Sequence, residues 1–426
     1  MYKIGIIGLG YVGLTLTAAL AQKSNEIFAF DSDTELTNNL NNGDIPFIEN
    51  NFQSIFSTFI NKKIFILNDL NSMPIVDFIF VCIGTPKSEM NHLNQFKELV
   101  KNIIDKSKHI ILRSTLTVGT TSQLYTDLKL AKTSNYLSYC PERTIEGNAI
   151  QEIFDLPQII SSECDKGLLE LRELFSNLGI EYIVSSNTKS AEMSKVICNV
   201  WRDYTFAFAN ELSVISSDLN LDVMEVIALS NYKYSRSRIP KPGPVGGPCL
   251  TKDTHILLHN LNHRSNFLFL MAREVNERVY ENLINYFISQ NDQYINKTIL
   301  VLGLAFKGYP ETDDFRNGAA VEFLDKIQLL KLNFTVRTWD PNISFNSKFS
   351  SFERNIDELI STANYIILSN NSPYFETDKF IESVLKNSRD DVKIIDLFPL
   401  TKVRKELSSN IVLRKNWDST TISEKE

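Results

Sequence analysis

Short apolar runs alternate with amphipathic stretches over the first half of the chain. The apolar runs are bounded by Gly, Asn, Asp and Pro, as the buried strands of a sheet are. Between several of them the apolar positions recur with helical spacing, as in residues 14–22 and 93–106. Strands that alternate with helices predict a doubly wound parallel sheet with right-handed crossovers. The runs expected to be strands are YKIGII (2–7), EIFAF (26–30), DFIFVCI (77–83), HIILRS (109–114), NYLSYC (135–140) and PQIIS (157–161).

The pattern changes at about Ala191, where long helical periodicity replaces the strands. The helical stretches cover residues 191–219, 223–229 and 267–289, with a Pro/Gly loop between the last two. From Lys297 the alternation returns. The predicted fold class is α/β, with an N-terminal Rossmann domain, a central all-helical domain and a C-terminal Rossmann-like domain. The predicted parts are 1–188, 189–290 and 291–415, with a polar tail at 416–426; the late strands expected are 298–306, 334–340, 365–369 and 392–398, and the late helix is 318–331.

The overall composition narrows the range of partners and locations. The 426 residues are enough for two or three domains, and 44 Lys and Arg against 51 Asp and Glu give a net charge of −7. The charges are scattered, so neither a nucleic-acid surface nor an anionic membrane surface is expected. The N-terminus lacks the long apolar region of a signal peptide, and no segment has the roughly 18 apolar residues of a membrane span. A cytoplasmic protein is therefore expected.

The five cysteines are Cys82, Cys140, Cys164, Cys198 and Cys249. They are too few for a disulfide scaffold, leave one unpaired and lack the CxxC spacing of zinc sites. No metal site is predicted, and a cysteine with a special role here would be a reactive one.

A glycine motif, Gly8-Leu-Gly10-Tyr-Val-Gly13, follows the first expected strand and opens a helix. Such glycines permit a tight turn, a close approach of backbone to a pyrophosphate, and close packing of helix on strand. Asp31 lies eighteen residues after Gly13, at the end of the second strand, where a carboxylate accepts hydrogen bonds from a ribose 2′-hydroxyl. The combination predicts an NAD site rather than an NADP site. A glycine turn without a ligand is the alternative.

Two threonines also follow expected strands. Thr85 in IGTP and Thr115 in RSTLTVGTT lie at the carboxyl edge, where such sheets bind ligands. Taken alone, each threonine fits a structural role better than a binding role.

One side of the long central helix carries four polar groups, Lys195, Asn199, Arg202 and Asp203, in an otherwise apolar stretch. A lysine there could serve as an acid/base group and an asparagine could donate to an oxyanion. A solvated stripe with helical ion pairs is the alternative.

Cys249 lies in GPVGGPCLTKD, a loop of glycines and prolines, and not in an apolar periodic segment. Lys252 follows three residues later and a helix is expected to begin nearby, and both features favour a thiolate. Asp253 would share the helical face of Cys249. The glycines indicate backbone that approaches another group closely. A turn cysteine followed by a helix-capping aspartate is the alternative.

These motifs together resemble the UDP-glucose/GDP-mannose dehydrogenase family of nucleotide-sugar 6-dehydrogenases, in order and over nearly the whole chain. The pairing of RD with FAFANEL is most similar to the UDP-N-acetylhexosamine branch, especially the UDP-N-acetylmannosamine dehydrogenases. The matching segments are GLGYVG, GTP, STLTVGTT, CPERTIEGNAIQEI, AEMSKVICN, RDYTFAFANEL, PGPVGGPCLTKD and GLAFKGYPETDDFRNG.

The resemblance implies an NAD-dependent, four-electron oxidation of the sugar C6 alcohol to a carboxylate. It makes Cys249 the nucleophile that adds to the intermediate aldehyde, giving a thiohemiacetal and then a thioester. Lys195 and Asp253 would handle the proton of the alcohol, and Asn199 would help to hold the oxyanion. Glu142 would be the base that hydrolyses the thioester, with Thr115 orienting the water.

The resemblance also implies binding residues and assembly. A homodimer formed through the central helices is expected, and the product would be a uronic acid for a surface polysaccharide. The expected NAD contacts are Gly8, Gly10, Tyr11, Val12, Gly13, Asp31, Thr85, Thr115, Lys252 and Arg316; the expected nucleotide-sugar contacts are Arg143, Lys195, Asn199, Arg202, Arg236, Gly243 and Lys307.

The chain departs from the family pattern in three places. Thr251 stands where many relatives have proline, RNGAA replaces RESPA after Arg316, and PGPVGG is one residue shorter than in some branches. Lys233 and Arg238 compete with Arg236 for its role. UDP-glucose is the alternative substrate. A two-electron hydroxyacid dehydrogenase and a non-catalytic nucleotide-sugar binding protein are the alternatives from other classes.

Overall fold

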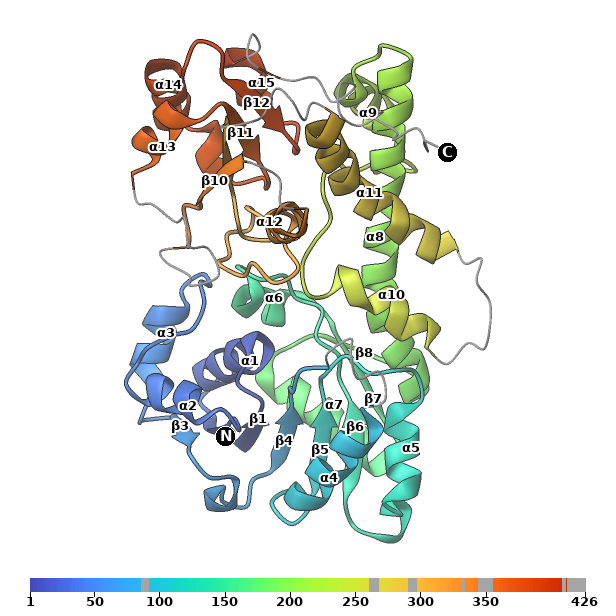
Figure 1. Cartoon of the computed structure of the whole chain (residues 1–426). Coiled ribbons are helices and arrows are strands. Elements are labelled where there is room, and N and C mark those ends of the chain that lie inside the picture. Colours follow the sequence, from blue (N-terminus) through green and yellow to red (C-terminus); the bar gives the residue numbers. More distant parts are fainter. Residues whose placement is uncertain are drawn as a thin grey trace. The chain divides into compact units, whose positions relative to one another are not determined.

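The computed structural model describes residues 1–85, 92–259, 268–289, 297–330, 334–343, 355–407 and 411 (Figure 1). The chain forms two compact units, which are described separately. The first comprises residues 1–198 and 255–263, and the second comprises 199–254 and 264–426. The boundaries at 188, 290 and 415 remain predictions, and the predicted tail at 416–426 lies outside the described residues.

The first unit is built on an eight-stranded sheet in the order β3-β2-β1-β4-β5-β6-β7-β8. All six strands predicted for this half are present. β3 and β8 were not predicted, and β7 runs antiparallel to β6, so the prediction of a wholly parallel sheet is wrong at that pair. The strands are β1 (Lys3–Ile7), β2 (Glu26–Phe30), β3 (Ile64–Leu67), β4 (Phe78–Val81), β5 (His109–Leu112), β6 (Tyr136–Tyr139), β7 (Gln158–Ser162) and β8 (Tyr182–Val184).

Helices cover both faces of this sheet, which explains why its central strands are continuous apolar runs. One face packs on α1, α3, α6 and α7, with Phe52 and Phe56 in its core. The other packs on α4 and α5, with Phe96 and Val100 in its core. The helices are α1 (Tyr11–Gln22), α2 (Thr34–Asn41), α3 (Phe52–Phe59), α4 (Leu93–Ile103), α5 (Thr120–Asp127), α6 (Ala149–Asp155) and α7 (Asp165–Leu178).

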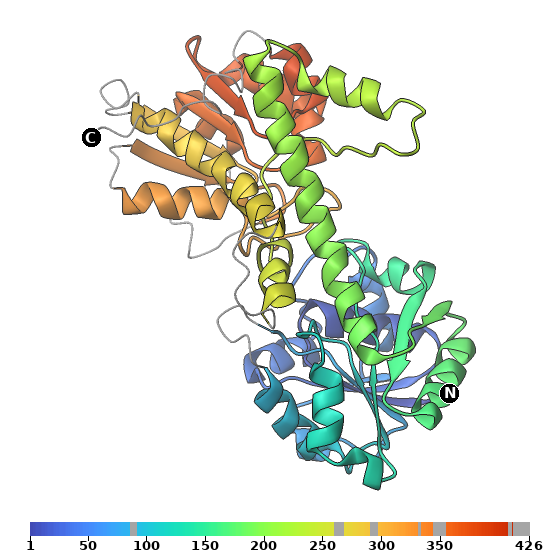
Figure 2. The ribbon, with the colours of Figure 1, turned by 90° about the vertical axis from the view of Figure 1, so that its right-hand side faces the viewer.

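The second unit combines long helices with a four-stranded parallel sheet in the order β10-β9-β11-β12. Figure 2 shows α8 and α11 side by side, and buried hydrogen bonds join them. The elements are α8 (Thr188–Asp218, which begins in the first unit), α9 (Val223–Asn231), α10 (Leu250–Leu258), α11 (Leu268–Ser289), β9 (Lys297–Leu302), α12 (Ala319–Leu329), β10 (Phe334–Trp339), α13 (Ile356–Thr362), β11 (Tyr365–Leu368), α14 (Asp378–Asn387), β12 (Lys393–Asp396) and α15 (Thr401–Glu406).

The four strands β10-β9-β11-β12 repeat the arrangement of β2-β1-β4-β5 in the first unit. In both sheets a carboxylate at the end of one strand accepts a hydrogen bond from the backbone that follows the neighbouring strand. After β1, Leu9 N donates to Asp31, which follows β2, at 2.6 Å. After β9, Leu304 N donates to Asp340, which follows β10, at 2.7 Å. Burial raises the pKa of Asp340, against the effect of its backbone donors, whereas Asp31 is only half-buried. The first unit therefore keeps its acid accessible to a ligand.

Candidate functional site

In the glycine loop after β1, two of the three glycines are required by close packing within the chain, and the third has open space beside it. Gly8 has φ +92°, and a Cβ there would lie 2.8 Å from the backbone of Cys82. A Cβ on Gly13 would lie 1.8 Å from the carbonyl oxygen of Gly8. By contrast, a Cβ on Gly10 would meet no protein atom within 4 Å. Packing within the chain explains Gly8 and Gly13, whereas at Gly10 the free space accommodates a group from outside the chain.

The surroundings of this loop fit the adenosine and pyrophosphate of NAD. Asp31 lies at the carboxyl end of β2 and accepts hydrogen bonds from Leu9 N and from Asp33 N, the latter at 2.9 Å. The N-terminus of α1 begins directly after Gly10, where backbone N–H groups favour an anion. Thr85 is buried after β4, and Thr115 is half-buried after β5.

Tyr11 and Val12 open α1 but differ in their surroundings. The Tyr11 hydroxyl contacts the buried Glu49 carboxylate and lies 2.7 Å from Gly147 N. Val12 packs partly against the core of the sheet. The Tyr11 hydroxyl thus joins the glycine loop to the TIEGN segment, a connection that the sequence did not indicate.

Glu142 forms a buried ion pair with Arg113, a residue that sequence reasoning missed. Arg113 Nε donates to Glu142 at 3.0 Å, and the other carboxylate oxygen accepts from Arg143 N at 2.7 Å and Thr144 N at 2.8 Å. Burial alone would raise the pKa of Glu142, but Arg113, the Thr144 N–H and Lys195 together lower it. Glu142 is therefore held as a carboxylate, the form that a general base requires.

Two buried thiols also lie close to Arg113. Burial raises the pKa of the Cys82 thiol to about 12 and that of Cys140 to about 11, although Arg113 opposes both shifts. These two thiols are held neutral and unreactive. The Arg143 guanidinium donates to the carbonyl oxygen of Pro157, so it contributes to the fold of this segment.

The first turns of α8 are fixed by a carboxylate. Glu192 accepts from Gly119 N at 2.5 Å and from Thr121 N at 2.8 Å, and so caps the N-terminus of α5. Burial raises its pKa, although these donors oppose the shift. Lys195, half-buried, follows one turn later on the same helix. The anchoring of α8 by Glu192 sets the position of Lys195 within the first unit.

Three predicted catalytic residues come together in the second unit. Asn199 Nδ2 donates to Asp253 Oδ2 at 2.7 Å, and both side chains are buried. Cys249, half-buried, directly precedes α10, and its carbonyl oxygen accepts from Lys252 N and Asp253 N, the first helical hydrogen bonds. The N-terminus of a helix carries partial positive charge, which favours an anion on the sulfur.

The polar side chains predicted along one side of α8 do not form a solvated stripe. Asn199 and Asp203 are 8% and 1% exposed, so that alternative fails for both, whereas Arg202 is exposed. Asp203 accepts from Arg273 at 2.6 Å and from Asn276 at 2.8 Å. Burial raises the pKa of Asp203, against the opposing effect of Arg273. Asp203 thus joins α8 to α11.

The beginning of the cysteine loop is clamped by these same two helices. Asn210 of α8 exchanges two hydrogen bonds with Gly243, at 2.8 and 2.9 Å, and Arg273 of α11 donates to Val245 O at 3.1 Å. A Cβ on Gly243 would lie 2.9 Å from the ring of Phe398. Gly243 is therefore required by packing within this unit.

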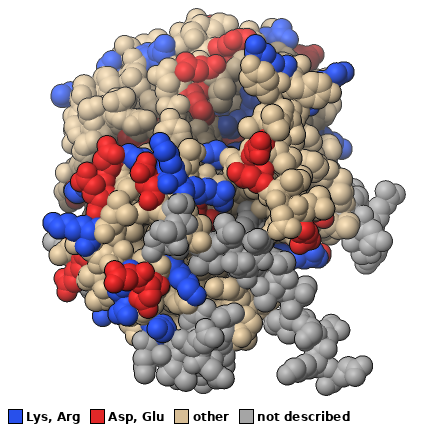
Figure 3. Space-filling model, turned by 90° about the horizontal axis from the view of Figure 1, so that it is seen from above, with Lys and Arg blue, Asp and Glu red and all other residues tan. Residues whose placement is uncertain are grey.

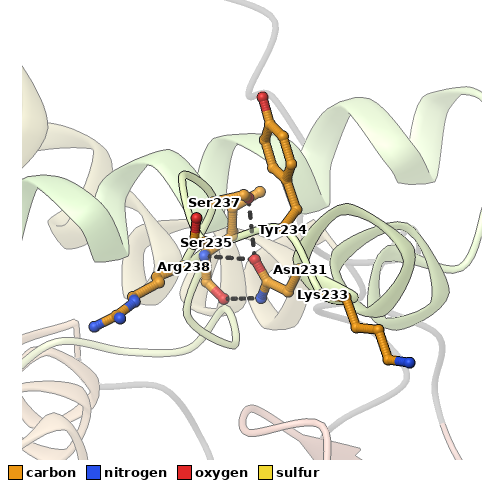
Figure 4. A pocket seen from close by; sticks show the side chains of 7 residues that line it. Asn231, Lys233, Tyr234, Ser235, Ser237 and Arg238 are labelled. Carbon is orange, nitrogen blue, oxygen red and sulfur yellow. Dashed lines mark hydrogen bonds between the residues drawn. The ribbon is translucent and has the colours of Figure 1, made fainter.

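The loop after α9 lines a cavity of about 550 Å³ (Figure 4). The amide of Asn231 organises it: the oxygen accepts from Ile239 N at 2.9 Å and the nitrogen donates to Ile239 O at 2.8 Å. The cations that line it are Lys233 and Arg238. The guanidinium of Arg236, the residue predicted to bind substrate, lies over the Tyr234 ring at 4.8 Å. Lys233 and Arg238, both of which line the cavity, therefore stay competitors of Arg236 for that role.

The remaining predicted cations lie near the surface. Arg316 is exposed and forms an ion pair with Asp314 at 2.6 Å, while Lys307 lies 5.7 Å from the centre of the Phe306 ring. Lys252 is half-buried in the first turn of α10. On the face that Figure 3 shows, cationic and anionic side chains are interspersed, in line with the scattered charge of the sequence.

Among the described residues, no group of His, Cys, Asp and Glu could hold a metal ion. The helices within the same ranges include none that is both long and apolar enough to cross a membrane.

Comparison with known proteins identifies the family. Residues 2–179 match the NAD binding domain of the UDP-glucose/GDP-mannose dehydrogenase family, and residues 189–278 match its central domain. A UDP-N-acetyl-D-mannosamine dehydrogenase of Methanococcus vannielii is 28% identical over 387 residues, 87% of each chain. The structure of a UDP-D-ManNAc dehydrogenase from Pyrococcus horikoshii, 26% identical, superimposes with a TM-score of 0.81 over 93% of this chain and 95% of that one.

A UDP-glucose dehydrogenase from Pyrobaculum islandicum has the same fold, with a TM-score of 0.81 at 19% identity over 95% of this chain and 96% of that one. The family match, the NAD loop and the fold agree. The chain therefore belongs to the UDP-glucose/GDP-mannose dehydrogenase family and is an NAD-dependent nucleotide-sugar dehydrogenase.

Proposed function

We propose that this enzyme oxidises the C6 alcohol of UDP-N-acetylmannosamine, or of another UDP-N-acetylhexosamine, to the carboxylate. The observation that carries the proposal is the contact of Asn199 with Asp253 beside Cys249, at the N-terminus of α10. A two-electron hydroxyacid dehydrogenase has no use for such a thiol. The names of the relatives from Methanococcus vannielii and Pyrococcus horikoshii support the choice of sugar.

The residues divide the chemistry into two oxidations and a hydrolysis. Bound NAD⁺ supplies the hydride acceptor, and two equivalents serve for each sugar. In the first oxidation, Lys195 and Asp253 take the hydroxyl proton of C6 through a water. Asn199 stabilises the oxyanion, because its amide is already oriented by Asp253.

Cys249 makes the second oxidation feasible. Its thiolate adds to the aldehyde carbon, and the resulting thiohemiacetal has a C6 hydrogen that leaves as hydride, which gives a thioester. Glu142, held as a carboxylate by Arg113, removes a proton from the water that attacks this thioester, with Thr115 orienting that water. The thiolate is the leaving group, so the enzyme is regenerated.

The nucleotide part of the substrate requires cations and backbone donors. We assign this role to Arg143, Arg202 and Lys307, with Arg236 or Arg238 as a further contact. Gly243 is left out, because its N–H and its carbonyl oxygen are both bonded to Asn210. Lys252 and Arg316 are assigned to the cofactor phosphates.

We further propose that the enzyme is a homodimer. Trp201, Phe208 and Ile215 recur every seventh residue along α8 and are 62%, 48% and 51% exposed. A helix that exposes such a stripe is suited to pack against the same helix of a second copy. A cytoplasmic location is part of the same proposal, supported by five free thiols.

A panel assay tests the substrate and the reaction class together. The purified enzyme is given NAD⁺ and each of UDP-ManNAc, UDP-GlcNAc, UDP-GalNAc, UDP-glucose and GDP-mannose. The expected result is about two NADH per UDP-ManNAc consumed. Faster turnover of UDP-glucose would transfer the assignment to that sugar, and a ratio near one would support the two-electron alternative.

Cys249→Ser separates the enzyme from a binding protein of the same fold. We expect this variant to stall with the aldehyde accumulated, since a serine hydroxyl is a much weaker nucleophile than a thiolate at neutral pH. Unchanged turnover to the uronic acid would contradict the role of Cys249. An unchanged cellular function without turnover would favour the non-catalytic alternative.

A further inference from the structure

A ring of hydrogen bonds through Asn317 closes around the loop that carries Cys249. Gly247 N donates to Asn317 O at 2.8 Å, Thr251 Oγ1 donates to Gly247 O at 2.9 Å, and Asn317 Nδ2 lies 3.4 Å from Thr251 Oγ1. Gly247 and Thr251 stand two residues before and two residues after Cys249. The ring therefore holds the chain on both sides of the thiol.

The backbone on both sides of this ring is fitted for the contact. Asn317 has φ +50°, a left-handed conformation that asparagine tolerates better than most residues. A Cβ on Gly246 would lie 2.4 Å from Asn317 O. Gly247 has φ +94°, and a Cβ there would lie 2.7 Å from the ring of Phe306. These glycines permit the loop to pack on the segment that runs from β9 to α12.

We propose that Asn317 is a positioning residue for Cys249 and acts through Gly247 and Thr251. Its carbonyl and its amide together fix the entry of the chain into α10, and hence the place of the sulfur at that helix N-terminus. The proposal rests on the role of Cys249 as nucleophile. It also gives a physical reason for two departures from the family pattern, Thr251 and RNGAA, because their side chains lie within hydrogen-bond distance of each other.

The ring also connects two functions. Asn317 directly follows Arg316, and Lys307 lies on the same β9–α12 segment; both are assigned above to ligand phosphates. The hydrogen bonds of Asn317 thus join the β9–α12 segment, which we assign to ligand binding, to the loop that carries Cys249. A change at Asn317 should disturb the reactivity of the thiol more than the affinity for the nucleotide, because the hydrogen bonds of Asn317 in this ring go to the cysteine loop.

The test uses the full-length enzyme in a Cys198→Ser background, since Cys198 is exposed and would react. Asn317→Gly keeps the carbonyl and the left-handed backbone and removes only the amide. Thr251→Val removes the hydroxyl, and Thr251→Ser retains it. The matched control is Asn220→Gly, at another asparagine with positive φ, in the connection between α8 and α9.

Two measurements are made on each variant. The first is the rate at which iodoacetamide alkylates Cys249, followed by peptide mass spectrometry. The second is the pair of kcat and KM for the supplied sugar aldehyde. Far-UV circular dichroism and tryptophan fluorescence confirm that each variant is folded.

Asn317→Gly and Thr251→Val are expected to change the alkylation rate by at least about threefold and to lower kcat for the aldehyde by about as much. KM should stay within about twofold of wild type, and Thr251→Ser and Asn220→Gly should match wild type. In the double variant the effect should not exceed that of the larger single change, because both act on one ring.

Two results would overturn the proposal. One is an alkylation rate in Asn317→Gly and Thr251→Val equal to that of Asn220→Gly. The other is a rise in KM without a change in alkylation, which would make Asn317 a substrate contact. Alkylation of Cys249 requires no turnover. The alkylation rates therefore test the role of Asn317 separately from the Cys249→Ser experiment, which tests the proposed function.

Discussion

The three glycines of the NAD loop should respond differently to the addition of one methyl group. At Gly10 the new Cβ meets no protein atom within 4 Å, and the backbone, at φ −68° and ψ −168°, suits alanine. Gly10→Ala should therefore leave the first unit as stable as wild type, or more stable by about 0.4–1 kcal/mol through the lower entropy of its unfolded chain. The same methyl group should fill space that we expect the pyrophosphate of NAD to occupy.

At Gly13 the new Cβ would lie 1.8 Å from the carbonyl oxygen of Gly8, well inside van der Waals contact. The start of α1 must then move away from β1, at a cost of about 1–3 kcal/mol. For a unit of this size each kcal/mol lowers Tm by about 2–4 °C. Gly13→Ala should lose both stability and NAD binding.

The assay combines calorimetric titration with NAD⁺ and thermal unfolding followed by far-UV circular dichroism. Tryptophan fluorescence cannot replace the latter, because Trp201 and Trp339, the tryptophans among the described residues, both belong to the second unit. Gly10→Ala should bind NAD⁺ about 10- to 100-fold more weakly, or by about 1.4–2.7 kcal/mol, at an unchanged or higher Tm. Wild-type affinity in Gly10→Ala, or a loss of Tm equal to that of Gly13→Ala, would refute this account of the loop.

Three further substitutions test the Arg113–Glu142 ion pair, the buried carboxylate of Asp396 and the exposed apolar side of α8. Arg113→Lys should raise the pKa of Glu142 and move the acidic limb of the pH–rate profile for thioester hydrolysis to higher pH, because Glu142 must be ionised to act; an unmoved limb would contradict its role. Asp396 has a pKa raised by burial from 3.8 to about 6, so its contribution to stability is complete below pH 3.8 and is lost as the pH rises through 6. The free energy of unfolding of wild type, minus that of Asp396→Asn, should therefore fall by up to about 3 kcal/mol between pH 3.8 and pH 6. Urea unfolding followed by tryptophan fluorescence measures this difference at each pH. A difference that does not change with pH would contradict the raised pKa of Asp396. If the proposed dimer forms through α8, Trp201→Glu should be monomeric in sedimentation velocity where wild type is dimeric; a monomeric wild type, or a variant that stays dimeric, would contradict this interface.

Three of the strands that the sequence predicted have every side chain enclosed. β4, β5 and β6 are buried along their whole length, so each appears as a continuous apolar run. β8 was missed because it has three residues and none of them is buried. The direction of β7 could not be read from the pattern either, since an apolar run has the same appearance in a parallel and an antiparallel pair.

The sequence predicted the candidate residues that lie close together along the chain. It did not predict the ion-pair partners that lie far away in sequence. Cys249, Lys252 and Asp253 lie within five positions of one another and could be associated by spacing alone. Arg113 and Glu142 are 29 positions apart, and Asp203 and Arg273 are 70 apart. Nothing in one sequence associates such pairs, because only the tertiary fold brings them together.

The glycines of the cysteine loop show what residue type alone cannot distinguish. The sequence indicated only that backbone there approaches another group closely. In the structure Gly246 approaches Asn317, Gly247 approaches Phe306 and Gly243 approaches Phe398, all within the same unit. A glycine that makes room for its own chain and one that makes room for a ligand have the same letter, but a virtual Cβ separates them: it clashes at Gly246 and meets nothing at Gly10. By this criterion the cysteine loop is held by its own chain. Gly10 leaves open space, as Gly43 and Gly84 also do, so its expected role toward NAD rests on its place between β1 and α1.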